Sequence, residues 1–255
     1  MSLLELKNIT KAYIEKGKFL PVIDEINLTI KEGEFVVIVG PSGSGKSTVI
    51  RIAAGLVPPT QGTILYKDEP ITSPNPNASI VFQNFALLPW LTVQENIELV
   101  LEVRSIPPRQ RIRTALKYID LVGLDSFEDA YPRELSGGMK QRVGFARALA
   151  VEPEILFMDE PFSALDVLTA ADLREEFLKF WVSGKLSIKS VLMVSHNIEE
   201  AILMSDRIIV LSSRPGKVVG EIQISLPRPR EPHSKEFEAI LDQVYSLIIS
   251  SHISK

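Results

Sequence analysis

Residues 35–48 read Phe-Val-Val-Ile-Val-Gly-Pro-Ser-Gly-Ser-Gly-Lys-Ser-Thr, and this stretch decides the fold. Its first part, Phe35–Val39, is a continuous apolar run rich in β-branched side chains, which predicts a buried strand. The apolar residues of Val49–Gly55 then follow helical spacing. A strand therefore leads through a glycine-rich loop into a helix, which is the local context of a phosphate-binding loop.

The glycine-rich loop matches the pattern G-x-x-x-x-G-K-[S/T]. Its glycines let backbone N–H groups converge on a phosphate, and the start of the following helix adds partial positive charge. We expect Lys46 to bridge the β- and γ-phosphates of a nucleotide, Ser47 to ligate Mg²⁺ and Thr48 to contact the α-phosphate. A chance glycine-rich turn is the alternative, and the strand–loop–helix context argues against it. The predicted cradle comprises Gly40, Pro41, Ser42, Gly43, Ser44, Gly45, Lys46, Ser47 and Thr48.

The composition narrows the class of protein. A chain of 255 residues fits one large α/β domain or one domain with a small lobe. The net charge of −4 gives no sign of nucleic-acid binding. The absence of cysteine excludes disulfides, iron–sulfur clusters and thiolate zinc sites, and it suits a cytosolic protein. Because no stretch approaches about 18 consecutive apolar residues and the start is unlike a signal peptide, we expect any membrane role to come from a partner.

Strand and helix patterns alternate along most of the chain. Further strands are predicted at Leu3–Ile9, Ile26–Ile30, Thr63–Tyr66, Ser79–Phe82, Ile155–Met158, Ser190–Val194, Arg207–Leu211 and Val218–Ile224. Further helices are predicted at Glu95–Val103, Arg109–Val122, Gly137–Ala150, Leu168–Trp181, Ile198–Met204 and Phe237–Ile249, and turns at Pro58–Gly62 and Lys67–Pro70. Between about Asn84 and Ser136 no strong strand pattern occurs, so we predict a helical lobe inserted into an α/β core.

A second apolar strand ends in two carboxylates, Asp159 and Glu160. Buried parallel strands deliver their C-terminal residues to one edge of the sheet, where the phosphate loop is also expected. We predict that Asp159 holds Mg²⁺, directly or through water, and that Glu160 orients and polarises the attacking water. Taken alone, the pair is equally well explained as a solvated strand end, and the phosphate loop makes that alternative the weaker one.

Residues 135–142 read Leu-Ser-Gly-Gly-Met-Lys-Gln-Arg and resemble the signature of the ABC ATPase family, Leu-Ser-Gly-Gly-x-x-x-Arg. The string is a second anion-binding helix start, since Ser136 caps the helix and Gly137 and Gly138 expose backbone N–H groups. An ordinary capped helix is the alternative, but it does not explain the accompanying motifs. The resemblance implies that this start stabilises the γ-phosphate of a neighbouring copy in a head-to-tail dimer.

The resemblance extends to three further positions. Gln83 matches the glutamine that contacts Mg²⁺ and the attacking water and joins the core to the helical lobe. Asp166, in Ser163-Ala164-Leu165-Asp166, matches the loop by which each subunit senses the site of its neighbour. Tyr13 matches the aromatic residue that stacks on adenine, with a core aromatic at a strand end as the alternative.

His196 matches the switch histidine that contacts the γ-phosphate. Its neighbours are Ser195 and Asn197, where Thr and Asp are expected in many relatives, so the residue that orients His196 remains open. The catalytic set implied by the resemblance is Glu160, His196, Gln83 and Lys46. The implied metal ligands are Ser47, Gln83 and Asp159. The family motifs cover about residues 3–225.

The resemblance implies an α/β fold with a P-loop NTPase core of ABC ATPase type, an N-terminal antiparallel β-subdomain and an inserted α-helical subdomain. We expect one ABC ATPase domain over residues 1–255. Its α/β core comprises 1–83 and 137–225, its helical insertion 84–136, and its C-terminal tail with a terminal helix 226–255.

The implied function is ATP hydrolysis, with ATP and Mg²⁺ as cofactors, coupled to transmembrane transport. Leu88–Val93, Arg214-Pro215-Gly216 and Leu226–Arg230 look like the nitrate/sulfonate/taurine group of importers, which favours uptake of a small anion. The alternatives are an ABC ATPase of another importer, an exporter, a lipid transporter, or a soluble ABC ATPase of translation or repair. The single cassette and the short segment between Gln83 and Ser136 argue against the soluble class.

The implied partners are a second copy of the chain, in an ATP-dependent dimer, or a paralogous ATPase subunit. Integral-membrane permease subunits would bind the helical lobe, where Trp90 is expected in the docking surface unless it packs inside the lobe. A periplasmic or extracellular solute-binding protein would act indirectly, and no nucleic acid is expected. These partners place the chain at the cytoplasmic face of the inner membrane as a peripheral subunit.

Overall fold

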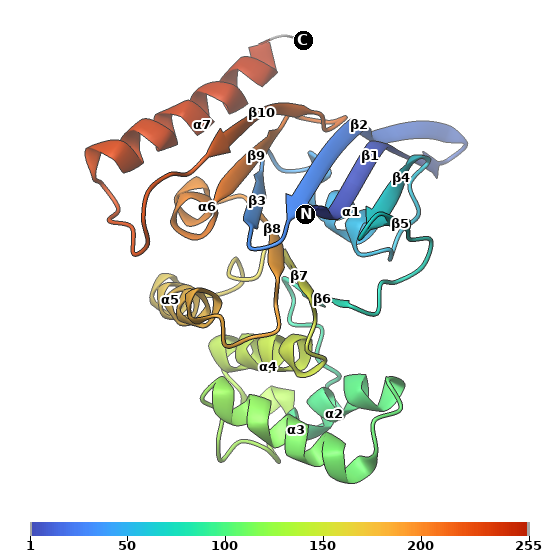
Figure 1. The fold of residues 1–255 in the computed structure, drawn as a ribbon, viewed down its shortest axis with the longest axis vertical. Coiled ribbons are helices and arrows are strands. Elements are labelled where there is room, and N and C mark those ends of the chain that lie inside the picture. Colours follow the sequence, from blue (N-terminus) through green and yellow to red (C-terminus); the bar gives the residue numbers. More distant parts are fainter. Residues whose placement is uncertain (1, 254–255) are drawn as a thin grey trace. The chain divides into compact units, whose positions relative to one another are not determined.

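The structure is a computed structural model that describes residues 2–253, and it divides into two compact units (Figure 1). The first unit combines Met1–Asn75 with Lys189–Lys255. The second unit is the intervening segment Pro76–Ile188. None of the helices within the described residues is long and apolar enough to cross a membrane.

The first unit contains an antiparallel sheet in the order β2-β1-β4-β5. Its strands are β1 (Ser2–Glu15), β2 (Lys18–Lys31), β4 (Gln61–Tyr66) and β5 (Glu69–Pro70). Lys16 and Gly17, which connect β1 to β2, both have positive φ angles, of 49° and 76°. Two such residues match the twist of the flanking strands and favour a tight hairpin.

A mainly parallel sheet in the same unit has the order β10-β9-β3-β8. Its strands are β3 (Phe35–Val39), β8 (Ser190–Ser195), β9 (Arg207–Leu211) and β10 (Val218–Gln223). β3 pairs in parallel with both β8 and β9, and every residue of these three strands is buried. The helices of this unit are α1 (Lys46–Ala53), α6 (Ile198–Met204) and α7 (Lys235–Ile253). Because α1 contacts β8 and α7 contacts β9, β10 and α6, helices cover the apolar strands.

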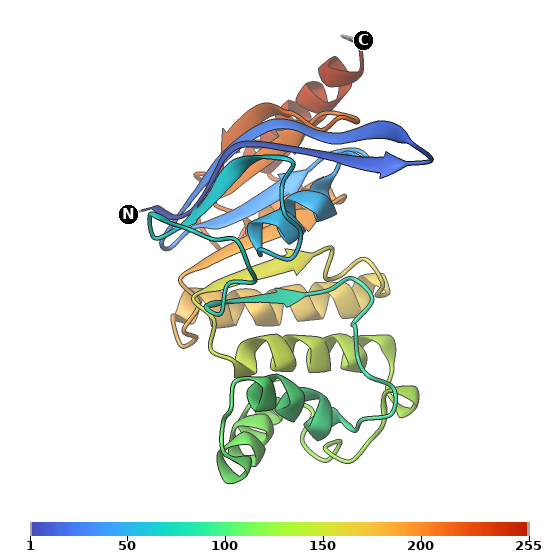
Figure 2. The same ribbon diagram turned by 90° about the vertical axis from the view of Figure 1, so that its right-hand side faces the viewer.

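The second unit is mainly helical. It contains the parallel strands β6 (Ala78–Val81) and β7 (Ile155–Asp159), together with α2 (Val93–Val103), α3 (Pro108–Leu121), the 3-10 turn η1 (Pro132–Glu134), α4 (Gly137–Ala150) and α5 (Val167–Ser183). α4 is the centre of this unit, because it packs against α2 and α3, and also against β6 and α5 (Figure 2).

The sequence-based prediction of elements is largely confirmed. β3, α4, α6 and β9 have the predicted bounds, and the other helices and strands differ mainly at their ends. The prediction of a continuous turn over Lys67–Pro70 is wrong, because Glu69 and Pro70 form the short strand β5. Pro70 lacks an N–H, so it is suited to an edge strand that pairs on one side only. The predicted bounds of the helical insertion, 84–136, stay a prediction.

Candidate functional site

The phosphate loop connects β3 to α1 in the first unit. Gly45 stands immediately before α1 with a left-handed φ of 94°. A Cβ at this position would lie 3.1 Å from both Val22 Cγ1 and the Val22 carbonyl oxygen. Only glycine combines this conformation with this close approach to β2 without strain. The loop therefore has the backbone that the sequence pattern predicts.

The side chain of Lys46 folds back onto the phosphate loop. Its Nζ donates to the carbonyl oxygens of Gly40 at 2.9 Å and Pro41 at 3.1 Å, and the residue is only 5% exposed. The Oγ of Ser44 is buried and has no hydrogen-bond partner among the described residues. A buried ammonium and an unpaired hydroxyl beside a glycine-rich turn fit an anionic ligand that accepts hydrogen bonds.

His196 follows the last residue of β8 and is exposed. Ser195 is paired in register with Val39, the last residue of β3. The phosphate loop and His196 therefore leave the same edge of the sheet from neighbouring parallel strands, which is where α/β folds place their ligands. The structure thus brings together two elements that are far apart in the sequence.

The two neighbours of His196 hold the turn that carries it. Ser195 Oγ donates to the buried carboxylate of Glu200 at 2.5 Å and accepts from the N–H of Asn197 at 3.0 Å. Asn197 Oδ1 accepts from the N–H of Glu200 at 3.1 Å and so caps α6. Ser195 and Asn197 stand where Thr and Asp are expected in many relatives. Ser195 provides a hydroxyl group that hydrogen-bonds to Glu200, and Asn197 provides the cap of α6. The sequence pattern did not reveal the role of Glu200.

Tyr13 lies in β1 opposite Leu20 of β2 and is 43% exposed. The ammonium of Lys11 stands 5.1 Å from the centre of its ring. Tyr13 is therefore not a core residue, and its ring offers an exposed face for stacking.

In the second unit, β6 and β7 end at the same edge, with Val81 paired in parallel with Met158. Gln83 follows β6 and is exposed, whereas Asp159 ends β7 and is buried. Because the pair is parallel, Gln83 and the two carboxylates after Met158 follow neighbouring strand ends. Their oxygen atoms are of the kind that Mg²⁺ prefers.

Glu160 has a left-handed backbone with φ of 47°. Its carbonyl oxygen accepts from Ser163 Oγ at 2.9 Å. A non-glycine residue in this region costs of order 1 to 3 kcal/mol, and such residues are concentrated at functional sites. The loop that contains Asp166 thus holds the turn at Glu160.

The signature helix α4 begins with a side-chain cap. Ser136 Oγ accepts from the N–H of Met139 at 3.2 Å. A Cβ at Gly138 would lie 2.5 Å from Thr169 Cγ2 at the start of α5. Asp166 caps α5 by accepting from the N–H of Thr169, which also lowers the pKa of Asp166. The predicted residues Ser136, Gly138 and Asp166 therefore stand at two helix starts that touch.

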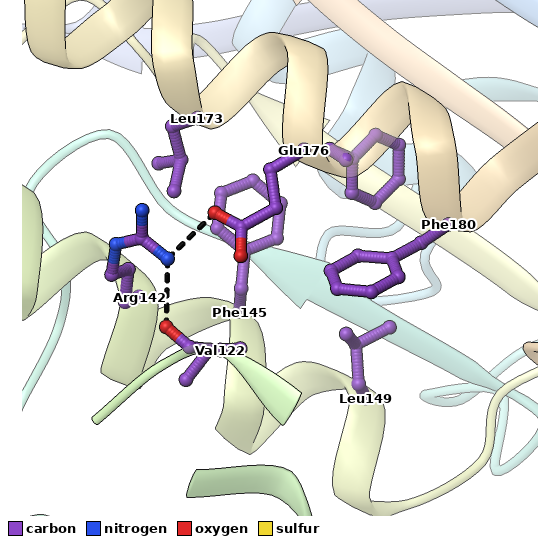
Figure 3. Close-up of a pocket in the computed structure, with 8 residues that line it drawn as sticks. Val122, Arg142, Phe145, Leu149, Leu173, Glu176 and Phe180 are labelled. Atoms are coloured by element: carbon purple, nitrogen blue, oxygen red, sulfur yellow. Dashed lines mark hydrogen bonds and ion pairs between the residues drawn. The ribbon is translucent and has the colours of Figure 1, made fainter. Parts of the chain in front are cut away.

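Arg142, the last residue of the signature, joins three elements. One nitrogen, Nη1, donates to Val122 O at 2.7 Å and to Glu176 Oε2 at 2.6 Å (Figure 3). Aromatic and aliphatic side chains surround this ion pair, and the full lining consists of Val122, Arg142, Phe145, Leu149, Leu173, Glu176, Phe177 and Phe180. The ion pair with Glu176 thus holds α4 against α5, and the residues around it enclose only a small cavity.

Arg147 of α4 binds the segment that follows Gln83. It donates to Phe85 O at 2.9 Å and to Ala86 O at 2.6 Å. Phe85 and Ala86 both have left-handed φ angles, of 62° and 50°. Burial lowers the pKa of Arg147, although an arginine stays charged. Sequence reasoning missed this contact, because no local pattern indicates a partner 61 residues away.

Trp90 lies further along the same segment. It is 68% exposed, so the alternative that it packs inside the lobe does not hold.

The sequence of this chain is similar to known proteins along nearly its whole length. A family model described as ABC transporter matches residues 23–163. An uncharacterized ABC transporter ATP-binding protein of Methanocaldococcus jannaschii is 46% identical over 234 residues, which cover 92% of this chain and 86% of that protein. The nitrate import ATP-binding protein NrtD of Synechocystis sp. is 42% identical over 254 residues, covering 96% of this chain and 94% of NrtD. The aliphatic sulfonates import ATP-binding protein SsuB of Bacillus cereus is 39% identical over 241 residues, or 94% of each chain.

The fold is similar to that of a solved ATP-binding cassette. A dimeric, post-hydrolysis structure of the cassette MJ0796, bound to ADP and Pi, matches with a TM-score of 0.77 and 34% sequence identity. The match covers 88% of this chain and 100% of that chain. The predicted fold class, a cassette with an antiparallel β-subdomain and a helical subdomain, is confirmed.

Proposed function

Because the chain belongs to the ABC transporter family, we propose that it is the ATPase subunit of an importer that takes up a small anion. As a member of this family, the chain binds ATP and hydrolyses it. The observation that carries the proposal is the co-occurrence of an intact phosphate loop at α1 and an intact signature at α4. Sequence identity of 39% or more to nitrate and sulfonate import subunits supports the direction and the class of solute.

The roles of the site residues follow from their chemistry. The N–H groups of the phosphate loop and the ammonium of Lys46 would bind the β- and γ-phosphates. Tyr13 would stack on adenine, and His196 would contact the γ-phosphate. Glu160 would accept a proton from the attacking water, as a general base does. The left-handed turn at Glu160 supports this role, because strained backbone is often found at catalytic residues.

The side chains predicted as metal ligands are of the kinds that bind Mg²⁺. Ser47, Gln83 and Asp159 would provide a hydroxyl, an amide and a carboxylate oxygen. Mg²⁺ is usually held by one or two carboxylates together with substrate phosphates, so a larger acidic cluster is not required. None of the described residues forms a group of three or more His, Cys, Asp or Glu suited to a metal ion. When bound, the ion would neutralise charge on the phosphates.

Each chain has two helix starts suited to anions, one at α1 and one at α4, and this pairing is the reason to propose a dimer. One nucleotide needs one phosphate loop, yet each chain carries a second helix start at Ser136–Gly138. We propose that this second start binds the nucleotide of another copy, head to tail, or that of a paralogous subunit. The dimeric form of the similar cassette MJ0796 supports this arrangement.

The membrane-spanning part of the importer would be a separate permease. The exposed Trp90 region of the helical insertion 84–136 would dock on it, with residues 1–83 and 137–225 as the catalytic core. The chain would then lie at the cytoplasmic face of the membrane as a peripheral subunit, with a solute-binding protein acting on the opposite side.

ATP turnover by the purified chain, with and without Mg²⁺, tests the enzymatic part of the proposal. Lys46→Ala should abolish turnover and weaken ATP binding, because it removes the charge that faces the phosphates. Uptake of labelled nitrate and of an alkanesulfonate by cells that lack this chain tests the transport part. Loss of uptake of one of these anions, restored by the wild-type chain and not by Lys46→Ala, is the expected result. Normal uptake of both would contradict the assignment to this group.

A further inference from the structure

The turn between β9 and β10 contains Arg214-Pro215-Gly216, a motif to which the ATPase cycle assigns no role. Gly216 forms two backbone hydrogen bonds with β2. Its N–H donates to Val22 O at 2.8 Å, and its carbonyl oxygen accepts from Asp24 N at 3.0 Å. Arg214 Nε adds a hydrogen bond to Pro21 O at 3.0 Å. The turn is therefore fixed to β2 along several consecutive residues.

The other side of this turn touches the phosphate loop. A Cβ built at Gly216 would lie 2.0 Å from the carbonyl oxygen of Ser44 and 3.2 Å from the Ser44 carbonyl carbon. The next loop residue, Gly45, faces Val22 of β2, where an added Cβ would lie 3.1 Å from the Val22 carbonyl oxygen. Ser44 thus lies against Gly216, and Gly45 lies against the part of β2 to which Gly216 is hydrogen-bonded.

We propose that Gly216 is a positioning residue of the nucleotide site, which fixes the peptide between Ser44 and Gly45 so that the phosphate loop stays open to a diphosphate group. In a trans peptide the carbonyl and the N–H point in opposite directions. The Ser44 carbonyl oxygen faces Gly216, so the N–H of Gly45 faces away from the turn. Phosphate binding by such loops depends on the direction of these N–H groups. The inference rests on the proposed nucleotide-binding function.

The size of the effect follows from the contact distance. Real Cβ atoms essentially never approach a heavy atom within 3.0 Å, so Gly216→Ala requires a movement of at least 1.0 Å (3.0 − 2.0). A misplacement of about 1 Å in a reactive site can lower its efficiency about a hundredfold. Because backbone hydrogen bonds hold Gly216 to β2, Gly216 cannot make the whole movement, and Ser44 has to shift as well. We therefore expect Gly216→Ala to weaken nucleotide binding by about tenfold or more.

Fluorescence titration with mant-ATP and mant-ADP in the presence of Mg²⁺ tests this expectation on the full chain. Both nucleotides carry a β-phosphate, so Gly216→Ala should raise both Kd values by a similar factor. Gly220→Ala is the matched control, because Gly220 lies in β10 and the three atoms nearest to its added Cβ all belong to the side chain of Leu247, the first at 2.5 Å. That flexible side chain can move, and the control should bind both nucleotides within about twofold of the wild type. Circular dichroism at the titration temperature establishes that each variant is folded.

A folded Gly216→Ala protein with wild-type Kd values would overturn the inference, since a purely structural glycine changes stability and not the affinity of the folded protein. If Gly216→Ala does not fold, Arg214→Ala leaves Gly216 in place and removes the hydrogen bond from Arg214 Nε to Pro21 O, and it should raise both Kd values by about two- to fivefold. Unchanged affinity in that folded variant would equally overturn it. Failure of the wild-type chain to bind either nucleotide would instead refute the proposed function.

Discussion

Arg147→Met should uncouple the segment after Gln83 from the signature helix. The substitution keeps the length and the aliphatic part of the side chain but removes both donors to Phe85 O and Ala86 O. Hydrogen bonds from a charged group contribute about 1.5 to 3 kcal/mol each, so the pair contributes at least about 3 kcal/mol. The left-handed conformations of Phe85 and Ala86 cost about 1 to 2 kcal/mol each. Arg147 thus offsets a strain of similar size.

Without the guanidinium, the strained segment should relax and its native conformation should become a minor one. A preference of about 2 kcal/mol for other conformations corresponds to roughly a 30-fold loss of the native population, at about 1.4 kcal/mol per tenfold. Since Gln83 precedes this segment directly, we expect kcat for ATP hydrolysis to fall by about 30-fold. The phosphate loop lies elsewhere in the chain, so the Kd for ATP should change by less than about threefold.

Steady-state hydrolysis, nucleotide titration and urea unfolding together test this prediction. Arg113→Met is the matched control, because Arg113 is exposed on α3 and loses the same charge. Arg147→Lys keeps the charge but replaces the two donor nitrogens of the guanidinium with one ammonium nitrogen, so it should recover only part of the activity. If Arg147→Met lowers the free energy of unfolding while kcat stays within about twofold of the wild type, the contact is only structural and the reasoning is refuted.

Three further variants test the assigned roles. Glu160→Gln should lower hydrolysis at least about a hundredfold while ATP binding is kept and an ATP-dependent dimer accumulates in size-exclusion chromatography; near-normal turnover would contradict the role of Glu160. Ser136→Arg should leave ATP binding by the monomer almost intact and abolish hydrolysis, and in a mixed dimer it should disable the site whose phosphate loop is on the other subunit. Loss of the mutant chain's own site would rule out composite sites. Trp90→Ala should leave the thermal stability of the isolated subunit unchanged but weaken co-purification with its permease, as expected for an anchor that contributes at least about 2 kcal/mol; unchanged co-purification and transport would place the docking surface elsewhere.

Much of the fold was predictable because the pattern of apolar residues along the sequence matches the pattern of buried residues in the structure. The run Phe35–Val39 is apolar at every position, and every position is buried. Capping residues Ser136 and Asn197 stand directly before α4 and α6, so both helix starts were predicted correctly. The strands β1 and β2 are much longer than the predicted segments, because the residues on either side of their hairpin turn, 10–15 and 18–21, contain no buried position and therefore show no apolar alternation.

The candidate site was predicted only as far as its motifs extend. Phosphate-loop and signature residues are recognisable because backbone N–H groups must be exposed at those spacings. Contacts that depend on tertiary structure leave no such pattern. Arg147 contacts carbonyl oxygens about 60 residues earlier in the chain, and the role proposed for Gly216 depends on its close approach to Ser44, where an added Cβ would lie 2.0 Å from the carbonyl oxygen. Neither partner could be identified without the structure.

The two helix starts that we propose as anion-binding sites differ in how they are capped. α1 begins after Gly45, which has no side chain to cap the helix, whereas Ser136 caps α4 through the N–H of Met139. A helix without a side-chain cap gains most when a ligand accepts from its first N–H groups. A bound phosphate would therefore act at α1 as the missing cap, whereas at α4 it would add to a helix start that Ser136 already caps. This asymmetry supports an order of events in which ATP binds first at the phosphate loop of one copy and then attracts the signature helix of another.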